Sequence, residues 1–569
     1  MQACIFSMHG VIWIPILRQR TTVTSRYLPE RRAEMNKHDK MKTSGISPGS
    51  PRRCGATSGG EKEWWMNFFD TEWKRFSFDA HTPEHTAKQV DFIIEKLGLE
   101  KDHNVLDLAC GIGRHALELS RRGFRHVTGQ DFCQEYLDIA AKQAEAEGLK
   151  TEFLNSDIRR IPGYANLDAI YCWHTSFGYF KDEAENERVA DAIGGALKQG
   201  GLFLLDTINR DWVVRNLQSQ GWHGEAPYYI LEKNRFDLAT STHHGEWTFI
   251  SEDGKTHTKR MQLRQYSLHE LIELFARYGL RFNKAWGSVD GDEFTMNSRR
   301  MIILFSNRKG FKMNDINKSD WGSQWWTQFF DDSYGRMGLD VIDTQRTQKE
   351  VDFIAYTLEL KKDERILDLA CGKGRHALEL ARRGFTKVTG LDLTEDYLNE
   401  AKKVKAVEDL KVRFIAGDMR DIPFQAEFDA AYNYFTSFGF FADDKDNEKV
   451  IASVSRTLKP GGRILIETIN RDRMVRHFRK LGWYERGGEY VLKSFDIDLE
   501  TSTLISEWTY LAGERKTVRP VRIRMYSLHE MISMLQRNGL EYVDSWGNKD
   551  IEPLTLDNHR LILMARKED

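Results

Sequence analysis

The sequence predicts an α/β protein made of two tandem copies of one domain, each with a mostly parallel sheet covered by helices on both faces. Three observations indicate this fold class. Segment 104–129 recurs without a gap at 365–390, with 20 of 26 positions identical. Within each copy, short apolar strands alternate with helical or turn segments, as in a parallel sheet between helix layers. After the fifth strand, each copy changes to β-rich sequence.

The copies also share shorter motifs, namely EWWMNFFD with QWWTQFFD, TSFGYF with TSFGFF, TINRD with TINRD and YSLHE with YSLHE. A period of this length is far too long for a solenoid, so each copy should bury its own core. We therefore divide the chain into a basic leader and linker at 1–60, a first domain at 61–308, a linker at 309–320 and a second domain at 321–569. The short linker leads us to expect contact between the two lobes.

The elements of the first copy follow from its patterns, in chain order. Apolar residues at Val90, Ile93, Ile94 and Leu97 have helical spacing, and 351–358 repeats it. Five apolar strands are predicted at 105–109, 126–129, 151–155, 167–173 and 201–207. The β-rich segments 225–265 and 486–525 are predicted to form an antiparallel insertion over the carboxyl edge of each sheet. The YSLHE segments then begin helices, with capping boxes at Ser267 with Glu270 and at Ser527 with Glu530.

Composition excludes several classes of protein. With 569 residues, 40% hydrophobic and 30% charged, the chain can build sizeable cores under a polar surface, which excludes global disorder. No apolar run approaches the roughly 18 residues that span a bilayer, so we expect no membrane association. The six cysteines show neither a CxxC pair nor zinc-ligand spacing, so we predict no metal site and a cytoplasmic location.

The charge is unevenly distributed. Residues 1–60 hold ten Lys and Arg against three acids, and because the whole chain carries −2, residues 61–569 carry −9. An acidic body is a poor match for a phosphate backbone, so no nucleic-acid partner is expected. The leader resembles an organelle transit peptide, which would imply organelle import. We favour the alternative of a disordered or wrongly extended N-terminus, with Met35 or Met41 as the true start.

A glycine turn joins the first strand to a helix in each copy. Glycines at Gly111 and Gly113 let the backbone approach a ligand closely, and the N-terminus of the following helix presents free N–H groups to an anion. A carboxylate-bearing cofactor would fit there. The turn alone is weak evidence, because GxGxxA also fits a dinucleotide-binding fingerprint.

Three aspartates at successive strand ends restrict the kinds of ligand that would fit. Asp107 lies in the otherwise apolar first strand, where a carboxylate suits a ligand with an ammonium group. Asp131 closes the second strand, where it can accept both hydroxyls of a ribose, and Asp157 closes the third, where it can accept from an adenine amine. Amino acid, ribose and adenine in this order describe S-adenosylmethionine. The second copy has the same set at Asp368, Gly372, Gly374, Asp392 and Asp418.

The motifs LDLACGxGRH, the acid after VTGx, the SD or GD after the third strand, and LKQGG or LKPGG resemble class I S-adenosylmethionine-dependent methyltransferases. The resemblance implies two Rossmann-like domains with seven-stranded sheets. Ala109 and Ala370 stand where the fullest family motif has its first glycine. The implied cofactor residues are Asp107, Ala109, Gly111, Gly113, Asp131, Phe132, Asp157 and Ile158, and in the second copy Asp368, Ala370, Gly372, Gly374, Asp392, Leu393, Asp418 and Met419.

The fourth strand ends in YCWHTSFGYF or YNYFTSFGFF, where this fold places its acceptor. Neither segment contains NPPY, DPPY or a Pro-Cys nucleophile, which argues against amide, exocyclic amino and pyrimidine C5 acceptors. Arg264 and Arg524 could bind an acidic acceptor, although a solvated strand arginine is the simpler interpretation. Phe435 stands in the second copy where the first copy has His174, so the two copies do not share a histidine that could act as a base. Shared candidates for orienting an acceptor are Tyr171, Thr175, Tyr266, Tyr432, Thr436 and Tyr526.

The function that the sequence predicts is methyl transfer from S-adenosylmethionine to a small-molecule N or O acceptor, with a cofactor site in each lobe. The paired tryptophans at 64–65 and 325–326 are interpreted as packing of a lid over the site. One alternative keeps catalysis in a single lobe and makes the other a binding scaffold. Further alternatives are an RNA methyltransferase and a nicotinamide oxidoreductase.

Overall fold

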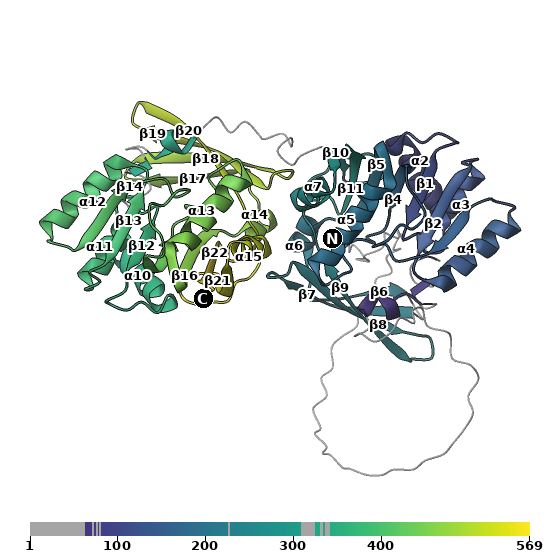
Figure 1. Cartoon of the computed structure of the whole chain (residues 1–569), viewed down its shortest axis with the longest axis horizontal. Coiled ribbons are helices and arrows are strands. Elements are labelled where there is room, and N and C mark those ends of the chain that lie inside the picture. The colour runs from purple at the N-terminus through teal and green to yellow at the C-terminus, as the bar shows by residue number, and fades with distance from the viewer. Residues whose placement is uncertain are drawn as a thin grey trace, which may run out of the picture.

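The computed structural model describes residues 63–70, 73–74, 78, 81–225, 228–308, 325–330, 334–335 and 342–568. The predicted leader at 1–60 and linker at 309–320 lie outside the described residues. Two lobes lie side by side, each with a central sheet and helices around it (Figure 1). None of the helices in the described part of the chain is long and apolar enough to cross a membrane.

The first lobe contains a seven-stranded sheet in the order β10-β11-β5-β4-β1-β2-β3. Its first five strands in the chain pair in parallel, and the last two are antiparallel to their neighbours. The strands are β1 (Asn104–Leu108), β2 (His126–Asp131), β3 (Glu152–Asn155), β4 (Leu167–Cys172), β5 (Leu197–Ile208), β10 (Leu280–Trp286) and β11 (Arg300–Asn307).

Helices bury apolar faces on both sides of this sheet. On one side, α5 and α7 pack on Leu106, Leu108 and Phe203, and on the other, α2 and α3 pack on Val105 and Leu204. Alternate residues of one strand thus enter opposite cores, as strand geometry requires. The bounds are η1 (Trp64–Asn67), α2 (Pro83–Leu97), α3 (Arg114–Arg121), α4 (Gln134–Ala146), α5 (Glu183–Ala196), α6 (Arg210–Asn216) and α7 (Leu268–Arg277).

The second lobe repeats the first, with the sheet order β14-β13-β12-β15-β16-β22-β21. Its strands are β12 (Ile366–Leu369), β13 (Val388–Asp392), β14 (Val412–Ala416), β15 (Phe428–Asn433), β16 (Leu458–Ile469), β21 (Leu540–Trp546) and β22 (Arg560–Lys567). Its helices are α8 (Trp325–Phe329), α10 (Thr344–Thr357), α11 (Arg375–Arg382), α12 (Glu395–Val407), α13 (Asp444–Thr457), α14 (Arg471–Arg476) and α15 (Leu528–Arg537).

A four-stranded antiparallel cap sheet is inserted after the fifth strand of each lobe. In the first lobe it contains β6 (Gln220–Glu225), β7 (Tyr228–Asp237), β8 (Thr242–Ile250) and β9 (Thr256–Arg264). In the second it contains β17 (Leu481–Arg486), β18 (Glu489–Asp498), β19 (Thr503–Ala512) and β20 (Arg515–Arg524). The predicted fold class is therefore confirmed. Each cap begins one strand earlier than predicted, because the glycine-containing first strand gains its stability by pairing with the second.

Two further local patterns concern strand and helix ends. The fifth strand starts at Leu197 and Leu458, the first residues of the LKQGG and LKPGG segments, which in the first lobe is four residues before the predicted start at 201. Both predicted capping boxes are present, and the carboxylates of Glu270 and Glu530 accept hydrogen bonds from the backbone N–H groups of Ser267 and Ser527. Each box satisfies N–H groups that the first helical turn leaves free.

The repeated TINRD motif forms a reciprocal contact between the lobes. Arg210 makes two hydrogen bonds to Asp472, at 2.6 and 3.1 Å, and Arg471 makes two to Asp211, at 2.7 and 3.1 Å. The two arginine side chains are 0 and 1% exposed. In Figure 1, α6 and α14, which carry these residues, meet at the junction of the lobes. The arginine of each motif thus contacts the aspartate of the other, which is a pseudo-two-fold arrangement.

The repeated YSLHE motif extends the same interface. His269 Nε2 lies 2.7 Å from Glu530 Oε1, and His529 Nε2 lies 2.6 Å from Glu270 Oε1. The histidine in each motif therefore contacts the capping glutamate of the other lobe. The same glutamate caps its own helix and binds the partner lobe, which couples helix formation to lobe packing.

Candidate functional site

The glycine turn after the first strand has a strained backbone that the surrounding packing enforces. Ala109 and Ala370 have φ values of 60° and 57°, the left-handed region that favours glycine. Gly113 follows at φ 72° and begins α3, and a Cβ atom there would lie 2.7 Å from the Phe153 ring. Glycine is therefore required at 113. Backbone strain held in place by packing is typical of a binding site.

Asp107 and Asp368 lie at the bottom of the site in the two lobes. Their residues are 1 and 2% exposed, and Oδ2 of each carboxyl group has no hydrogen-bond partner among the described residues. Burial raises the pKa of each carboxyl group to about 7. A buried polar atom without a partner is costly, so these two oxygens fit a ligand that brings a donor or a positive charge.

Asp131 and Asp392 tie the second strand of each lobe to its glycine turn. Asp131 accepts hydrogen bonds from the backbone N–H groups of Gly111, at 2.8 Å, and Cys133, at 2.9 Å. Asp392 accepts the equivalent bonds from Gly372, at 2.7 Å, and Thr394, at 2.8 Å. Burial raises the pKa of Asp131 to about 6. Each carboxylate oxygen keeps a further lone pair for a ligand hydroxyl.

Asp157 and Asp418 close the third strand and are bound by an arginine two residues later. Arg159 Nη2 lies 2.5 Å from Asp157, and Arg420 Nη2 lies 2.6 Å from Asp418. Arg159 also contacts the Phe180 ring, with its guanidinium carbon 4.4 Å from the ring centroid. Because each arginine fixes its carboxylate, the acid presents its remaining lone pairs in one orientation.

The end of the fourth strand is the most strained segment of each site. His174 and Thr175 have φ values of 60° and 63°, and Phe435 and Thr436 have 74° and 61°. Asp206 supports the first pair, accepting a hydrogen bond from the His174 N–H at 3.0 Å through its side chain. Two consecutive left-handed residues with side chains cost a few kcal/mol in both lobes. The acceptor position suggested by the sequence is thus a strained, supported turn.

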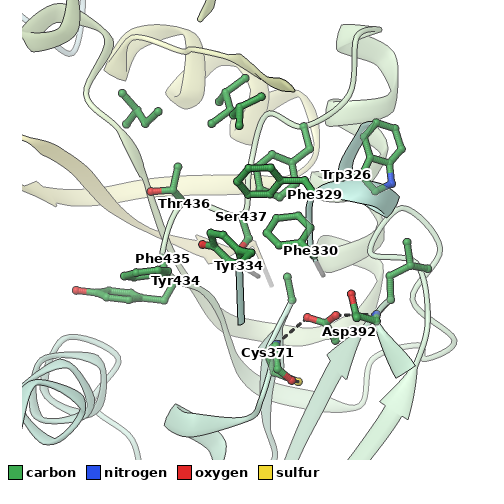
Figure 2. Close-up of a pocket in the computed structure, with 18 of the residues that line it drawn as sticks. Trp326, Phe329, Phe330, Tyr334, Cys371, Asp392, Tyr434, Phe435, Thr436 and Ser437 are labelled. Atoms are coloured by element: carbon green, nitrogen blue, oxygen red, sulfur yellow. Dashed lines mark hydrogen bonds between the residues drawn. The ribbon is translucent and has the colours of Figure 1, made fainter. Parts of the chain in front are cut away.

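The two lobes differ in the space above these residues. The second lobe has a cavity of about 950 Å³ and the first has two of about 90 and 30 Å³. Figure 2 shows the large cavity, with Phe329, Phe330 and Tyr334 on one side and Asp392 across from them. In the first lobe the Phe78 ring covers the glycine turn, since a Cβ atom on Gly111 would lie 2.8 Å from it.

The predicted cofactor residues converge on these cavities. Seven of the eight in each lobe line the cavity, and the exceptions are Gly113 and Gly374, at the N-termini of α3 and α11. The residues that line the cavity are Asp107, Ala109, Gly111, Asp131, Phe132, Asp157 and Ile158, and Asp368, Ala370, Gly372, Asp392, Leu393, Asp418 and Met419.

The candidates for orienting an acceptor divide into two groups. Thr175 and Thr436 line cavities and accept hydrogen bonds from Arg300 and Arg560, at 2.9 and 2.7 Å. The four tyrosines do not line the cavities. Those of the fourth strand are fully buried beside the aspartates of the first strand, and those of YSLHE bind acids of α5 and α13. The four are Tyr171, Tyr432, Tyr266 and Tyr526.

Arg264 and Arg524 are also placed away from the cavities, contrary to the expectation of an acceptor site or a solvated strand. Arg264 lies 2.7 Å from Glu270, and Arg524 lies 2.9 Å from Glu530. Both guanidinium groups are buried in the lobe interface, where they orient the capping glutamates. The alternation of side chains along a strand could not distinguish a side chain that points into the cavity from one that points into the lobe interface.

Other cavity residues have only a weak signal in the sequence. Arg114 and Arg375 follow the last glycine of the turn, and Arg114 binds Thr86 and Gln89 of α2, at 3.1 and 2.6 Å. In the first lobe His81 stacks on His85 and packs edge-on against His174, with ring centroids 5.4 and 4.7 Å apart. Burial lowers the pKa of His81 to about 3, so this group is neutral at physiological pH.

Comparisons with known proteins agree with this geometry. A methyltransferase domain is matched at residues 105–201 and again at 366–462. The glycine/sarcosine/dimethylglycine N-methyltransferase of Actinopolyspora halophila is 23% identical over 409 residues, which cover 66% of this chain and 69% of that protein. The dTDP-3-amino-3,4,6-trideoxy-alpha-D-glucopyranose N,N-dimethyltransferase of Streptomyces venezuelae is 35% identical over 102 residues, or 18% of this chain and 41% of that protein.

Among solved structures, an S-adenosylmethionine-dependent methyltransferase from Clostridium acetobutylicum is similar with a TM-score of 0.37 and 22% identity, covering 42% of this chain and 96% of that one. The methyltransferase match falls once in each lobe, over the strands that carry the three aspartates and the glycine turn. The chain therefore contains two methyltransferase domains in tandem, one in each lobe.

Proposed function

We propose that each lobe binds one S-adenosylmethionine molecule and methylates a nitrogen or oxygen atom of a small molecule. The observation that carries this proposal is the buried, unpaired oxygen of Asp107 and Asp368, beside a glycine turn that opens a helix. An ammonium group suits such an oxygen, and a carboxylate suits the N–H groups at the start of a helix. The amino-acid part of S-adenosylmethionine has both groups.

The rest of the cofactor follows from the next two strand ends. Asp131 and Asp392 would accept the ribose hydroxyls with the lone pairs that the backbone leaves free. Asp157 and Asp418, fixed by their arginines, would accept the adenine amine, with Ile158 or Met419 against the ring. The three aspartates that this assignment uses line one cavity in each lobe.

When bound, S-adenosylmethionine supplies a methyl group already activated by its positive sulfur. The chain then has to align the acceptor and exclude water, and a dedicated base is optional. His174 in the first lobe and Phe435 in the second share the strained backbone but not a titratable side chain. We therefore assign the shared role at this turn to its backbone and to Thr175 and Thr436, which orient the acceptor.

A small acceptor is supported by the cavity and by the relatives. A volume of about 950 Å³ is in the range of small-molecule sites. The relatives described above are named for methylation of glycine derivatives and of an amino sugar nucleotide. The net charge of −9 on residues 61–569 disfavours an RNA acceptor.

Lobe-specific variants test the proposal. Asp131→Ala and Asp392→Ala each remove the ribose ligand of one lobe, so calorimetric titration of S-adenosylmethionine should give two sites in the unchanged chain and one in each variant. Methyl transfer from a labelled donor to a metabolite panel should then retain one set of acceptors in each variant. A single site in the unchanged chain would contradict the proposal.

The contrast in cavity size favours one alternative, in which only the second lobe is catalytic. The cavities of the first lobe amount to about 90 and 30 Å³ because aromatic side chains, Phe78 among them, fill the space over the turn. If the first lobe were a scaffold, Asp131→Ala would leave all methyl transfer unchanged and Asp392→Ala would abolish it.

Changing Phe78 distinguishes a first lobe whose cofactor site is covered by this ring from a first lobe that has no cofactor site. Phe78→Ala should speed cofactor association with the first lobe, because the ring must move before a ligand reaches Gly111. Stopped-flow binding in the Asp392→Ala background isolates this lobe, and Phe78→Leu is the control of intermediate size. Equal association rates in all three proteins would show that Phe78 does not gate the site.

The raised pKa of Asp107 and Asp368 predicts pH-dependent cofactor affinity. Only the charged carboxylate attracts the ammonium group, so affinity should fall as pH drops below about 7, by up to about tenfold per pH unit in each lobe. Without ligand, pH changes the folding stability in the opposite direction. Each carboxyl group keeps its proton to a higher pH in the folded chain than in the unfolded chain, so the free energy of unfolding falls as the pH rises toward 7. Calorimetry between pH 5.5 and 8 measures the first effect. Asp107→Asn and Asp368→Asn should flatten it, each in its own lobe.

A further inference from the structure

The second cap sheet places a lysine without an acidic partner at its cavity. Lys493 of β18 lines the large cavity, with Nζ 3.4 Å from the centroid of the Trp508 ring and 5.0 Å from that of Tyr484. No salt bridge joins Lys493 to any residue that the structure describes. Burial, with the charge of Arg560, lowers the pKa of this ammonium group to about 8. The ring faces hold the group in place without neutralising it.

Arg473 and Arg560 are two of the four arginines that line the same cavity. The Nε atom of Arg473, on α14, is buried and has no hydrogen-bond partner among the described residues. Arg560, at the start of β22, pairs with Glu467 at 3.1 Å and donates to Thr436 at 2.7 Å. These three cationic side chains therefore line the cavity that also contains the turn at 435–436, and of the three only Arg560 forms a salt bridge with an acid that the structure describes.

The first lobe has an acid at the equivalent cap position, and burial raises the pKa of this acid to about 7; it is not among the residues that line the described cavities of that lobe. Glu232 of β7 occupies the position of Lys493, since both lie between the first and third cap strands, opposite Gly221 and Trp247 or Gly482 and Trp508. Trp212 of α6 stands where α14 has Arg473. Glu232 is largely buried, and its Oε1 atom lies 3.4 Å from His223 Nδ1. The cap of one lobe thus presents an acid where the other presents a base.

We propose that the acceptor of the second lobe carries an anionic group, a carboxylate or a phosphate, bound by Lys493 and Arg473, and that the acceptor of the first lobe lacks such a group. The inference depends on the proposed function, because it assigns the acceptor of that same site. A partly buried cation gains a strong partner when an anion enters, and a planar guanidinium suits both kinds of oxyanion. The first lobe has Glu232 and Trp212 in place of these two cations, so we expect the two lobes to select different acceptors.

A binding experiment tests the site without any methyl transfer. The full chain is saturated with S-adenosylhomocysteine and labelled with trace acetic anhydride at pH 8, with succinate, inorganic phosphate, neutral succinamide or chloride at equal ionic strength. A bound anion should raise the pKa of Lys493 from about 8 to about 9 or higher and slow its acetylation roughly fivefold or more, because less of the amine is then neutral at pH 8. Exposed Lys516 in the same cap is the internal reference. Arg473→Gln should weaken the protection of Lys493, and Glu232→Gln should leave it unchanged.

An activity experiment then measures how strongly the second lobe prefers anionic to neutral acceptors. In the Asp131→Ala background, amine and hydroxyl acceptors are offered in pairs, each acid beside its amide or dephosphorylated form. We expect at least a tenfold preference for the anionic member, and Lys493→Met should remove it while calorimetry still shows one S-adenosylhomocysteine site. Protection of Lys493 by succinate but not by phosphate would identify the anionic group as a carboxylate, and the reverse result would identify it as a phosphate.

Each failure has a different meaning. Equal acetylation of Lys493 with succinate, phosphate, succinamide and chloride would overturn the inference, as would equal turnover of the neutral and anionic partners. Loss of S-adenosylhomocysteine binding in the unchanged second lobe would instead overturn the proposed function. Lys493→Gln provides a second variant if Lys493→Met does not fold.

Discussion

Asp368→Asn should weaken binding of S-adenosylmethionine to the second lobe roughly 10- to 100-fold, which corresponds to about 1.5–3 kcal/mol for a hydrogen bond to a charged group. The variant keeps the shape of the side chain but removes its charge. Its free Oδ2 atom is the buried acceptor that the ammonium group would satisfy. Calorimetry in the Asp131→Ala background isolates the affected lobe.

The duplicated domain provides the control for this experiment. Asp107→Asn makes the same change in the first lobe and should leave the affinity of the second lobe unchanged. The neighbouring Tyr432→Phe removes a buried hydroxyl group that interacts with Asp368 but leaves the carboxylate in place, so it should weaken binding less than Asp368→Asn does. An Asp368→Asn protein that binds the cofactor like the unchanged chain would show that this carboxylate does not contact the ligand.

Arg471→Met should lower the free energy of unfolding by about 3–5 kcal/mol, because it leaves the buried Asp211 carboxylate without its partner. Both side chains are less than 4% exposed, and their two hydrogen bonds join one lobe to the other. Denaturant unfolding should show the loss, together with separate transitions of the two lobes in place of a shared one.

A double-mutant cycle measures the interaction energy between Arg471 and Asp211. Arg471→Met with Asp211→Asn removes both charges and should recover much of the stability lost by Arg471→Met alone. Arg382→Met breaks an exposed pair with Glu408 and should cost about 1 kcal/mol or less. If Arg471→Met cost no more than Arg382→Met, the reciprocal pairs would not hold the lobes together.

The fold and the cofactor cavity could be predicted because both depend on local order along the chain. Parallel strands end at one edge of a sheet, so Asp107, Asp131 and Asp157 had to lie near one another once the strands were recognised. The glycine turn is equally local, although the left-handed conformation of Ala109 is set by packing and not by its own preference.

What could not be predicted depends on contacts between distant segments. TINRD and YSLHE were visible as repeats, but nothing local indicates that Arg210 pairs with Asp472 or His269 with Glu530, some 260 residues away. The direction of Tyr171 and Arg264 was equally undetermined, because a residue near a strand end can face the cavity, the core or the other lobe. The role of Lys493 could not be predicted either, because only the pairing of the cap strands places it at the cavity.

The most direct test of two cofactor sites is a crystal structure of the chain with S-adenosylhomocysteine. The account predicts one ligand in each lobe, its ammonium group on Asp107 or Asp368 and its ribose hydroxyls on Asp131 or Asp392. A ligand that lies elsewhere, or one lobe that stays empty at saturating concentration, would contradict it.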